Sequence, residues 1–257
     1  MADGVSSFWG PVTSTYDWCE TNYVYSPYVA EIFNTLSNVP CILLALIGLV
    51  NSLSQRFEKR FSVLHLSNMI LSIGSILYHA TLQQLQQQAD ETPMVWEMLL
   101  YIYILYSPDW HYQSTMPTFL FLYGAVFAVA HSLFHFNTLF KVHYALLCLL
   151  CIPRMYKYYI HTEERSAKRI AKLYLATLVA ATSFWLVDRL LCKKISTGWW
   201  PYDLQGHAVW HFLMGFNSYF ANTFLMYCRA RQRGWDPKVK YFLSLFPYVK
   251  IEKPKQQ

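Results

Sequence analysis

The stretch Gly206-His-Ala-Val-Trp-His-Phe-Leu-Met-Gly215 places two histidines, His207 and His211, four residues apart in an apolar segment. On a helix, residues four apart lie on one face. The segment stays largely apolar to about residue 228, which is long enough for a helix to cross a bilayer. Histidines inside such a helix are costly unless they bind something. The spacing suits one metal ion, with a third ligand from elsewhere, although a pair hydrogen-bonded to neighbouring helices remains an alternative.

The composition is that of a membrane protein. Of 257 residues, 54% are apolar, 18% aromatic and 14% charged, whereas soluble domains average about 25% charged residues. The 20 tyrosines and 9 tryptophans fit aromatic belts at the two membrane interfaces. No basic n-region precedes the first apolar segment, so we expect that segment itself to direct insertion. No Gly/Ser-rich linker divides the chain, which predicts a single domain over residues 1–257.

Hydropathy predicts an all-α membrane protein with seven transmembrane helices. The expected spans are residues 32–54, 61–82, 93–107, 116–135, 138–157, 169–191 and 206–228.

The distribution of Lys and Arg, which are enriched in cytosolic loops, predicts the orientation. Neither occurs in residues 1–31 or 61–140, whereas residues 154–172 hold six and residues 229–255 hold eight. We therefore expect a lumenal N-terminal segment, 1–31, and a cytosolic basic tail, 229–257. Four basic residues run against the pattern: Lys141, Arg189, Lys193 and Lys194.

In this topology His79, near the end of the second span, reaches the same membrane depth as His207 and His211. Three imidazoles with one open position suit a catalytic zinc, which lowers the pKa of its bound water toward neutrality. Ser75 precedes His79 by four residues and shares its helix face, and Asp90 follows after a short polar loop. A carboxylate that carries a proton and a hydroxyl that bonds an oxyanion supply the remaining roles in amide hydrolysis.

A second histidine pair competes for the same metal. His131 and His135 are also four residues apart, near the lumenal end of the fourth span, and periodicity does not choose between the pairs. The other histidines have weaker claims, because lone histidines are usually just hydrogen-bonded. They are His65, His111, His143 and His161.

The N-terminal segment carries three carboxylates and an amide within fifteen residues and no basic side chain: Asp17, Glu20, Asn22 and Glu31. Such groups repel one another unless a cation or solvent intervenes. Calcium takes about six to eight oxygens, and a backbone carbonyl such as that of Trp18 could complete the set. The spacing is not that of an EF-hand, so a solvated acidic loop remains an alternative.

Together these motifs resemble the alkaline ceramidase family: Phe8-Trp-Gly-Pro11, Asp17-Trp-Cys-Glu-Thr-Asn22, Glu31, Gly74-Ser75 to His79, Asp90, and Gly206-His207 to His211. The resemblance covers nearly the whole chain. It implies a seven-helix membrane amidase, related in fold to the adiponectin receptors, that takes ceramide or phytoceramide from the bilayer and releases a sphingoid base and a fatty acid. It implies no nucleic-acid partner.

By matched position, the resemblance also implies the site residues. Zinc would be bound by His79, His207 and His211, catalysis would use Ser75 and Asp90, and calcium would be bound by Asp17, Trp18, Glu20, Asn22 and Glu31. A non-enzymatic alternative is a seven-helix receptor or transporter with a structural zinc. The open coordination position and Asp90 favour chemistry, because a closed structural site would need another protein ligand. The run Gln83 to Gln88 belongs to none of these motifs, and substrate choice could be influenced there.

Two of the six cysteines, Cys19 and Cys192, fall in or beside the oxidising lumen, where a disulfide persists. We expect them to pair and to pin the calcium loop against the helices. Closing so long a loop stabilises the fold by about 4 kcal/mol or slightly more in the chain-entropy model. The others are expected to be free thiols: Cys41, Cys148, Cys151 and Cys228.

The chain ends with lysines at the third and fifth positions from its C-terminus, Lys255 and Lys253. This pattern resembles the dilysine signal that a retrieval coat reads in the cytosol. It predicts a multi-pass protein of the endoplasmic reticulum or Golgi membrane. A short basic tail attracted to anionic lipid is the alternative.

Overall fold

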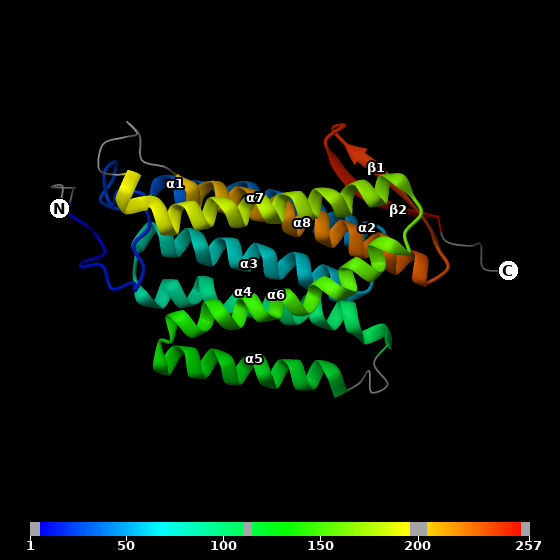
Figure 1. Ribbon diagram of the computed structural model, residues 1–257, viewed down its shortest axis with the longest axis horizontal. Coiled ribbons are helices and arrows are strands. Elements are labelled where there is room, and N and C mark those ends of the chain that lie inside the picture. Colours follow the sequence, from blue (N-terminus) through cyan, green and yellow to red (C-terminus); the bar gives the residue numbers. More distant parts are fainter. Residues whose placement is uncertain (1–5, 110–114, 196–204, 253–257) are drawn as a thin grey trace. The chain divides into compact units, whose positions relative to one another are not determined.

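The computed structural model describes residues 6–109, 115–195 and 205–252. Within these ranges the chain is mostly helical and ends in a β-hairpin (Figure 1). The elements are α1 (Ile32–Leu36), α2 (Val39–Ser54), α3 (Lys59–Thr81), α4 (Gln84–Tyr106), the 3-10 turn η1 (Ser107–Asp109), α5 (Thr115–Phe134), α6 (Asn137–Ile160), α7 (Arg165–Ile195), α8 (Gly206–Gln232), β1 (Asp236–Phe242) and β2 (Phe246–Glu252).

Five helical stretches in the described ranges are long and apolar enough to cross a membrane: Ile32–Ser54, Lys59–Thr81, Thr115–Phe134, Thr138–Ile160 and Arg165–Cys192. The exposed side chains of α5 include Phe119, Val126 and Leu133, as expected for a helix that contacts lipid. The two other long helices, α4 and α8, carry polar side chains that lower their hydropathy. The seven-span prediction is therefore supported for five spans.

The first predicted span, 32–54, is interrupted rather than continuous. Pro40 has no backbone N–H, and in a continuous helix its ring would clash with the carbonyl of Leu36, four residues earlier. Helix α1 accordingly ends at Leu36, and α2 begins at Val39 with Pro40 in its first turn. The side chains of Ser37 and Asn38 both donate hydrogen bonds to the carbonyl of Asn34, at 2.9 and 3.0 Å.

The polar loop expected before residue 93 is instead the beginning of α4. The helix starts at Gln84 and contains Pro93. Proline at this position leaves the carbonyl of Ala89, four residues earlier, without its helical hydrogen bond. That carbonyl faces Gly74 of α3 so closely that a Cβ on Gly74 would lie 2.1 Å from the oxygen. Glycine at 74 therefore permits the close approach of α3 and α4.

The C-terminal tail is not only a basic extension, and the all-α prediction is wrong there. Antiparallel strands β1 and β2 pair with Val239 opposite Val249. The Asn51 amide of α2 donates to the Val249 carbonyl at 2.8 Å and accepts from the Val249 N–H at 3.2 Å. The buried Asn51 side chain thus bonds the outer edge of β2 as a neighbouring strand would, a long-range pairing that local sequence does not reveal.

The chain divides into two compact units. One comprises Met1–Ala45, Asn68–Glu91 and Leu173–Ser218, and it contains every predicted metal and catalytic residue. The other comprises Leu46–Ser67, Thr92–Lys172 and Tyr219–Gln257 and includes the hairpin. The expectation of a single domain stays a prediction.

Within the second unit, a buried polar group joins three helices. Tyr101 of α4 donates a 2.5 Å hydrogen bond to the side-chain carbonyl of Asn222 in α8, and the Asn222 amide lies 3.4 Å from Nδ1 of His65 in α3. A Cβ at Gly48 of α2 would lie 2.2 Å from the His65 ring, so only glycine fits there. His65 is thus a hydrogen-bonded core histidine, as its weak metal claim predicted.

Candidate active site

Three buried histidines converge in the first unit. His79 comes from the end of α3, and His207 and His211 come from the first turns of α8. Their ligand nitrogens all lie within 4.8 Å of one another, and Nε2 of His79 is 3.0 Å from Nε2 of His211. Two imidazole nitrogens that face each other in a buried site are well placed to share one cation, which supports the predicted metal set.

The orientation of His79 is fixed by Glu31, the residue before α1. Nδ1 of His79 donates to Oε2 of Glu31 at 2.5 Å, and both side chains are fully buried. The Asn34 amide donates to the same carboxylate oxygen at 3.1 Å. A carboxylate on Nδ1 selects the tautomer whose Nε2 lone pair points away from it, as metal-binding histidines require.

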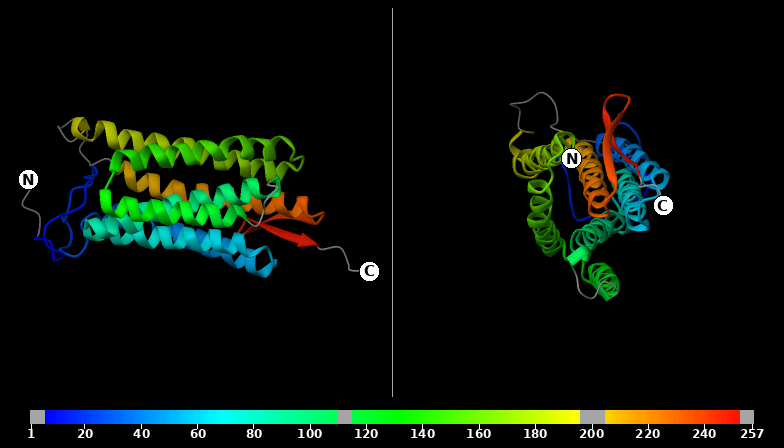
Figure 2. Two further views of the ribbon diagram at one scale, coloured as in Figure 1. Left: turned by 90° about the horizontal axis from the view of Figure 1, so that it is seen from below. Right: turned by 90° about the vertical axis from the view of Figure 1, so that its right-hand side faces the viewer.

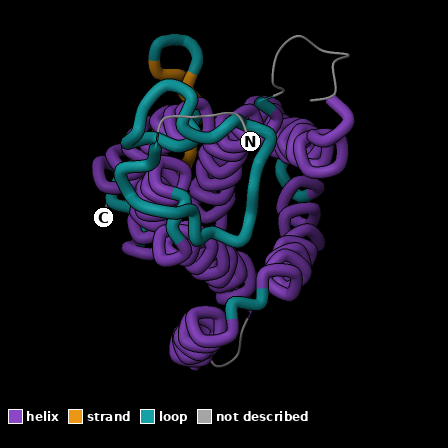
Figure 3. Tube along the Cα trace, turned by 90° about the vertical axis from the view of Figure 1, so that its left-hand side faces the viewer, coloured by secondary structure: helices purple, strands orange, loops and turns teal. Residues whose placement is uncertain are grey.

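His207 is held between two indole rings. The Trp18 ring stacks on it with ring centroids 3.4 Å apart and an interplanar angle of 10°, and Trp210 is parallel to it at 5.1 Å. Trp18 belongs to the N-terminal segment, which Figure 3 shows as loop rather than helix. The loop predicted to bind calcium therefore packs directly on a predicted zinc ligand.

Asp188 of α7 joins that loop to the beginning of α8. Its Oδ1 accepts from the backbone N–H of His207 at 3.0 Å, and its Oδ2 accepts from that of Cys19 at 3.4 Å. It also accepts from the N–H of Gly206, where a Cβ would lie 3.0 Å from the Cβ of Asp188. The first N–H groups of a helix have no partner within it, and this carboxylate satisfies two of them.

Sequence reasoning did not single out Asp188, although a carboxylate inside the apolar segment 169–191 was a usable signal. Its neighbour Arg189, an exception to the charge pattern, lies with its guanidinium 5.2 Å from the centre of the Tyr16 ring. This contact gives Arg189 a partner in the N-terminal segment.

Cys19 and Cys192 form a disulfide across 173 residues of sequence. Cys192 is one helical turn after Asp188 on α7, so the covalent bond and the carboxylate hold the same part of the N-terminal loop. The four other cysteines are free, as expected from the sequence.

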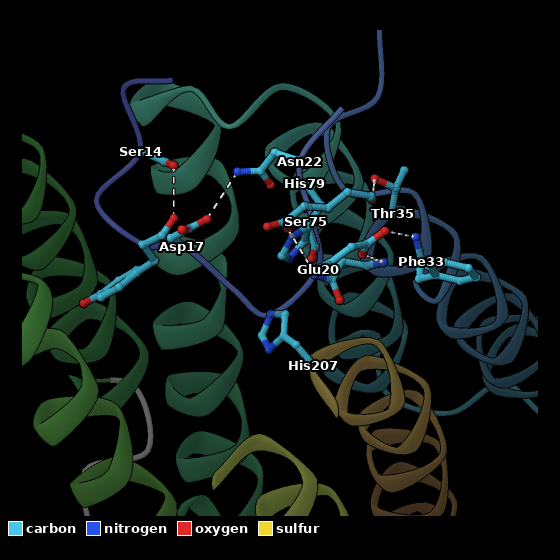
Figure 4. Close-up of polar contacts among 12 residues, drawn as sticks. Ser14, Asp17, Glu20, Asn22, Phe33, Thr35, Ser75, His79 and His207 are labelled. Carbon is cyan, nitrogen blue, oxygen red and sulfur yellow. Dashed lines mark hydrogen bonds and ion pairs between the residues drawn. The ribbon is translucent and has the colours of Figure 1, made fainter. Parts of the chain in front are cut away.

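Ser75 and Asp90 are hydrogen-bonded to each other. The amide of Asn38, in the turn between α1 and α2, donates to Oγ of Ser75 at 3.1 Å, which leaves the hydroxyl proton for the Asp90 carboxyl. Ser75 lies one turn before His79 on α3 (Figure 4). Gly74 lets the backbone of Ala89 and Asp90 in α4 come close to α3. The predicted catalytic pair thus adjoins the histidine group.

Burial raises the pKa of Asp90 to about 8. This value includes the nearby charge of Glu91, which also raises the pKa, and the hydrogen bond from Ser75, which lowers it. A carboxyl with its pKa near the working pH is suited to accept a proton and return it.

Three of the predicted calcium residues already have polar partners in the protein. Glu20 accepts from the backbone N–H groups of Phe33 and Asn34, at 2.7 and 2.8 Å, and so caps α1 (Figure 4). Asn22 donates to Asp17 at 3.2 Å. Glu20 is therefore bonded to the first turn of α1, and Asn22 to Asp17 within the loop.

Two features of this loop nevertheless fit a hard cation. Oδ1 of Asn22 and Oε1 of Glu31 are buried without a hydrogen-bond partner in the described structure. Burial also raises the pKa of Glu20 to about 7 and that of Glu31 to about 8, because a carboxylate removed from water lacks compensation. A bound cation would give the unpartnered oxygens a ligand and would compensate the buried negative charge of the carboxylates.

The rival histidines are not brought together as ligands. His131 is buried, with its ring 5.4 Å from each of the rings of Phe127, Phe136 and Phe140. His135 is exposed, at the end of α5. Within the described residues, the group of three or more ligating side chains is His79, His207 and His211.

The run Gln83 to Gln88 has a structural role that the sequence did not reveal. Gln83 donates to the carbonyl of Pro11 at 3.0 Å and accepts from the hydroxyl of Thr13. Gln87 accepts from the backbone N–H of Thr15 at 2.9 Å. These amides fasten the N-terminal segment to the start of α4.

Comparison with known proteins identifies the family. The model of the Ceramidase family matches residues 10–250. The chain belongs to the alkaline ceramidase family. It is 72% identical to an alkaline ceramidase of Arabidopsis thaliana over 257 residues, covering all of both chains. It is 29% identical to mouse Alkaline ceramidase 3, covering 95% of each chain. An alkaline ceramidase of Drosophila melanogaster is 26% identical over 95% of this chain and 90% of its own.

Membership confirms the resemblance recognised in the motifs, and with it that the protein is an enzyme, a hydrolase of the ceramidase class.

We predict that Cys19→Ser and Cys192→Ser lower the melting temperature of the purified enzyme to a similar extent. Each removes the same closed loop, worth about 4 to 5 kcal/mol in the chain-entropy model, so the double variant should be no less stable than either single one. Calcium affinity should fall in all three proteins. Additive losses of stability, or recovery of both cysteines as free thiols from oxidised protein, would contradict the pairing.

Replacing Asp188 should disturb the loop and α8 separately. In Asp188→Ala three backbone N–H groups lose their acceptor, and we expect a loss of about 2 kcal/mol or more together with a lower metal content. Asp188→Asn keeps one oxygen for α8 but presents an amide to Cys19, so metal should be retained while calcium affinity falls. Ser183→Ala on the exposed side of α7 is the control. Equal metal content in Asp188→Ala and the control would show that the cap does not position His207.

Proposed function

We propose that the enzyme hydrolyses the amide bond of ceramide within the membrane with the help of a zinc ion held by His79, His207 and His211. The observation that carries the proposal is the buried three-histidine group next to the Ser75–Asp90 pair. Family membership supports ceramide as the substrate class. Ceramide has a small head and two long chains, so it would reach these residues from the bilayer rather than from water.

The donor set fits zinc. Neutral imidazoles are usual zinc ligands, three of them leave a position open, and the Glu31 carboxylate on His79 is a typical outer partner of a zinc-bound histidine. When bound, zinc would supply Lewis acidity and lower the pKa of a coordinated water.

The roles of the chain's own residues follow from their positions. Asp90 would take the proton of the attacking water and return it to the leaving amine, which requires the carboxylate form first and the acid form second. The Ser75 hydroxyl donates a hydrogen bond to Asp90 in this structure. During the reaction it would rotate and donate to the oxygen that becomes negative in the tetrahedral intermediate. Asn38 holds Ser75 on the other side and so limits its rotation.

A receptor or transporter with a structural zinc is the alternative class. Membership of a hydrolase family does not favour it, and a structural site would not need a carboxyl whose pKa lies near 8.

Turnover by purified protein separates the two classes. Asp90→Ala should slow release of sphingoid base and fatty acid by about 100- to 10,000-fold, as expected for loss of a general base, while zinc content stays unchanged. The exposed Asp236→Ala serves as control. Products would be measured by mass spectrometry with ceramide and phytoceramide. Undiminished turnover by Asp90→Ala would contradict the assigned role, and no turnover by the parent protein would contradict the function.

The pH dependence of turnover should report the Asp90 carboxyl. Because a general base must be ionised and its pKa is raised to about 8, kcat/KM should rise with pH through this region and then level. Glu91→Gln removes a charge that raises this pKa, so the rising limb should move to lower pH. The displacement relative to the parent is the readout, since a bound zinc acts on both profiles. A limb that stays in place, or moves to higher pH, would contradict the assignment.

Calcium would be bound by the N-terminal loop, with oxygens of Asp17, Glu20, Asn22 and Glu31 and the carbonyl of Trp18. The unpartnered oxygens of Asn22 and Glu31 support this site. Because Glu31 also bonds His79, and the Trp18 ring covers His207, calcium would support the geometry of the histidine site rather than take part in the reaction.

For the membrane arrangement we propose seven spans, with residues 93–107 and 206–228, which lie largely in α4 and α8, added to the five supported by hydropathy. The N-terminus would be lumenal, where a disulfide persists, and the C-terminus cytosolic. We further propose residence in the endoplasmic reticulum or Golgi membrane. Lys253 and Lys255, the proposed retrieval signal, lie outside the described residues.

Replacing both lysines by serine tests the retrieval signal. The double variant Lys253→Ser, Lys255→Ser should move from the endoplasmic reticulum toward the Golgi and later membranes, because a retrieval coat no longer reads the tail. Fluorescence microscopy with compartment markers would measure this, and Lys172→Ser, at an exposed lysine away from the tail, is the control. An unchanged distribution would leave only attraction to anionic lipid.

A further inference from the structure

The C-terminal hairpin exposes large apolar side chains at its tip. Tyr241 and Phe242 at the end of β1 are 42% and 50% exposed, and Leu243 and Leu245 in the turn are 70% and 72% exposed. An apolar cluster of this kind on a projecting turn is unfavourable in water. Figure 1 shows that the hairpin turns back from the end of α8, and in the right-hand view of Figure 2 its tip stands out from the neighbouring helices.

The backbone conformation of the turn is unfavourable for the residues that it contains. Leu243 and Ser244 both have positive φ, 50° and 59°, in the left-handed region where glycine or asparagine is preferred. A leucine there is strained because its Cβ crowds the backbone. Strain retained at an exposed position indicates that the side chain itself has a use.

The outward face of the hairpin is mainly cationic, with three lysines and one carboxylate, Asp236, which lies 3.6 Å from Lys238. Lys238 is directly opposite Lys250 in the strand pairing, and Lys240 is two residues further along the same face of β1. Like charges opposite each other destabilise a hairpin. An anionic surface would remove that cost. Residues 229–252 contain six basic and two acidic side chains, so the whole segment attracts anions.

Hydrogen bonds also hold the hairpin along the length of β2. The Asn51 amide bonds the peptide group of Val249 on both sides, Gln55 accepts from the N–H of Ile251 at 3.0 Å, and Tyr219 donates to the carbonyl of Pro247 at 2.7 Å. These buried or half-buried contacts join β2 to α2 and α8 within one unit. The tip is therefore presented in a set direction and is not free to fold back.

We propose that residues 241–245 insert into the headgroup–acyl boundary of the membrane in which the enzyme resides, while Lys238, Lys240 and Lys250 contact the phosphates of anionic lipids. The apolar tip matches the acyl region, the lysines match the headgroups, and aromatic rings such as Tyr241 favour the interface between them. The hairpin is thus an interfacial anchor on the basic side of the protein. It is independent of the reaction at the histidine site.

Spin-label accessibility in nanodiscs tests the proposal on the full chain. A label on Ser244→Cys should collide more with oxygen, which concentrates in lipid, than with a water-soluble nickel complex. A label on Glu163→Cys, in the exposed α6–α7 connection, should show the reverse. The unsubstituted protein corrects for labelling of the four native thiols. We expect deeper insertion in discs of phosphatidylcholine with phosphatidylserine than in phosphatidylcholine alone, and loss of that difference in Lys238→Gln, Lys240→Gln, Lys250→Gln.

Leu243→Gly distinguishes lipid contact from folding. Glycine relieves the backbone strain, so thermal stability should not fall, yet the oxygen accessibility of the Ser244 label should decrease at least twofold because the apolar tip is smaller. Nickel accessibility at Ser244 equal to that at Glu163 in both types of disc would overturn the proposal. Dipolar broadening between the labels of two copies, without contact with lipid, would also overturn the proposal, because it would show that the tip mediates self-association.

Discussion

The bond between His79 and Glu31 is the constraint on which the rest of the site depends. Both groups are fully buried, and a carboxylate in that environment is stable only with strong partners. His79 supplies one partner and Asn34 another. In return the carboxylate fixes the imidazole so that its second nitrogen faces His211. The break between α1 and α2 also contributes to the site. Asn34, before the break, donates a hydrogen bond to Glu31, and Asn38, within it, donates one to Ser75.

The N-terminal segment completes the site by covering it. This segment has no helix of its own in its described part, and its position is fixed by contacts with three helices of the same unit. The disulfide and Asp188 attach it to α7, Gln83 and Gln87 attach it to α4, and Trp18 packs on His207 of α8. The loop that would hold calcium therefore also covers the three histidines. By limiting the access of water, it would strengthen electrostatic interactions within the site.

Much of the site was predictable because its residues obey local rules. Helix geometry alone predicts that His207 and His211 share a face, and that Ser75 and His79 do. The distribution of Lys and Arg predicts that the ends of the two helices lie at the same membrane depth. Periodicity alone could not exclude His131, since the decision rests on which helices meet. The roles of Asp188 and of the glutamines escaped prediction for the same reason, because their partners lie tens of residues away in sequence.

In the fold, too, features set by local sequence could be predicted, whereas features set by contacts between distant residues could not. Apolar length predicted the long helices, but not where α1 ends or where α4 begins. Those boundaries follow from Pro40 and Pro93 acting with neighbours in space, such as the Gly74 that receives the carbonyl of Ala89. The hairpin was missed because its outer edge is completed by a side chain, Asn51, from another element.

The most direct test of the central claim is the zinc content of purified single histidine variants. Mass spectrometry of metals should find about one zinc per chain in the parent enzyme and in His131→Ala, which also replaces a buried imidazole and so controls for disruption of the core. It should find little or none in His79→Ala, His207→Ala or His211→Ala, provided each variant remains folded by circular dichroism. Retention of zinc by His207→Ala together with its loss from His131→Ala would contradict the assignment of the metal to the three converging histidines.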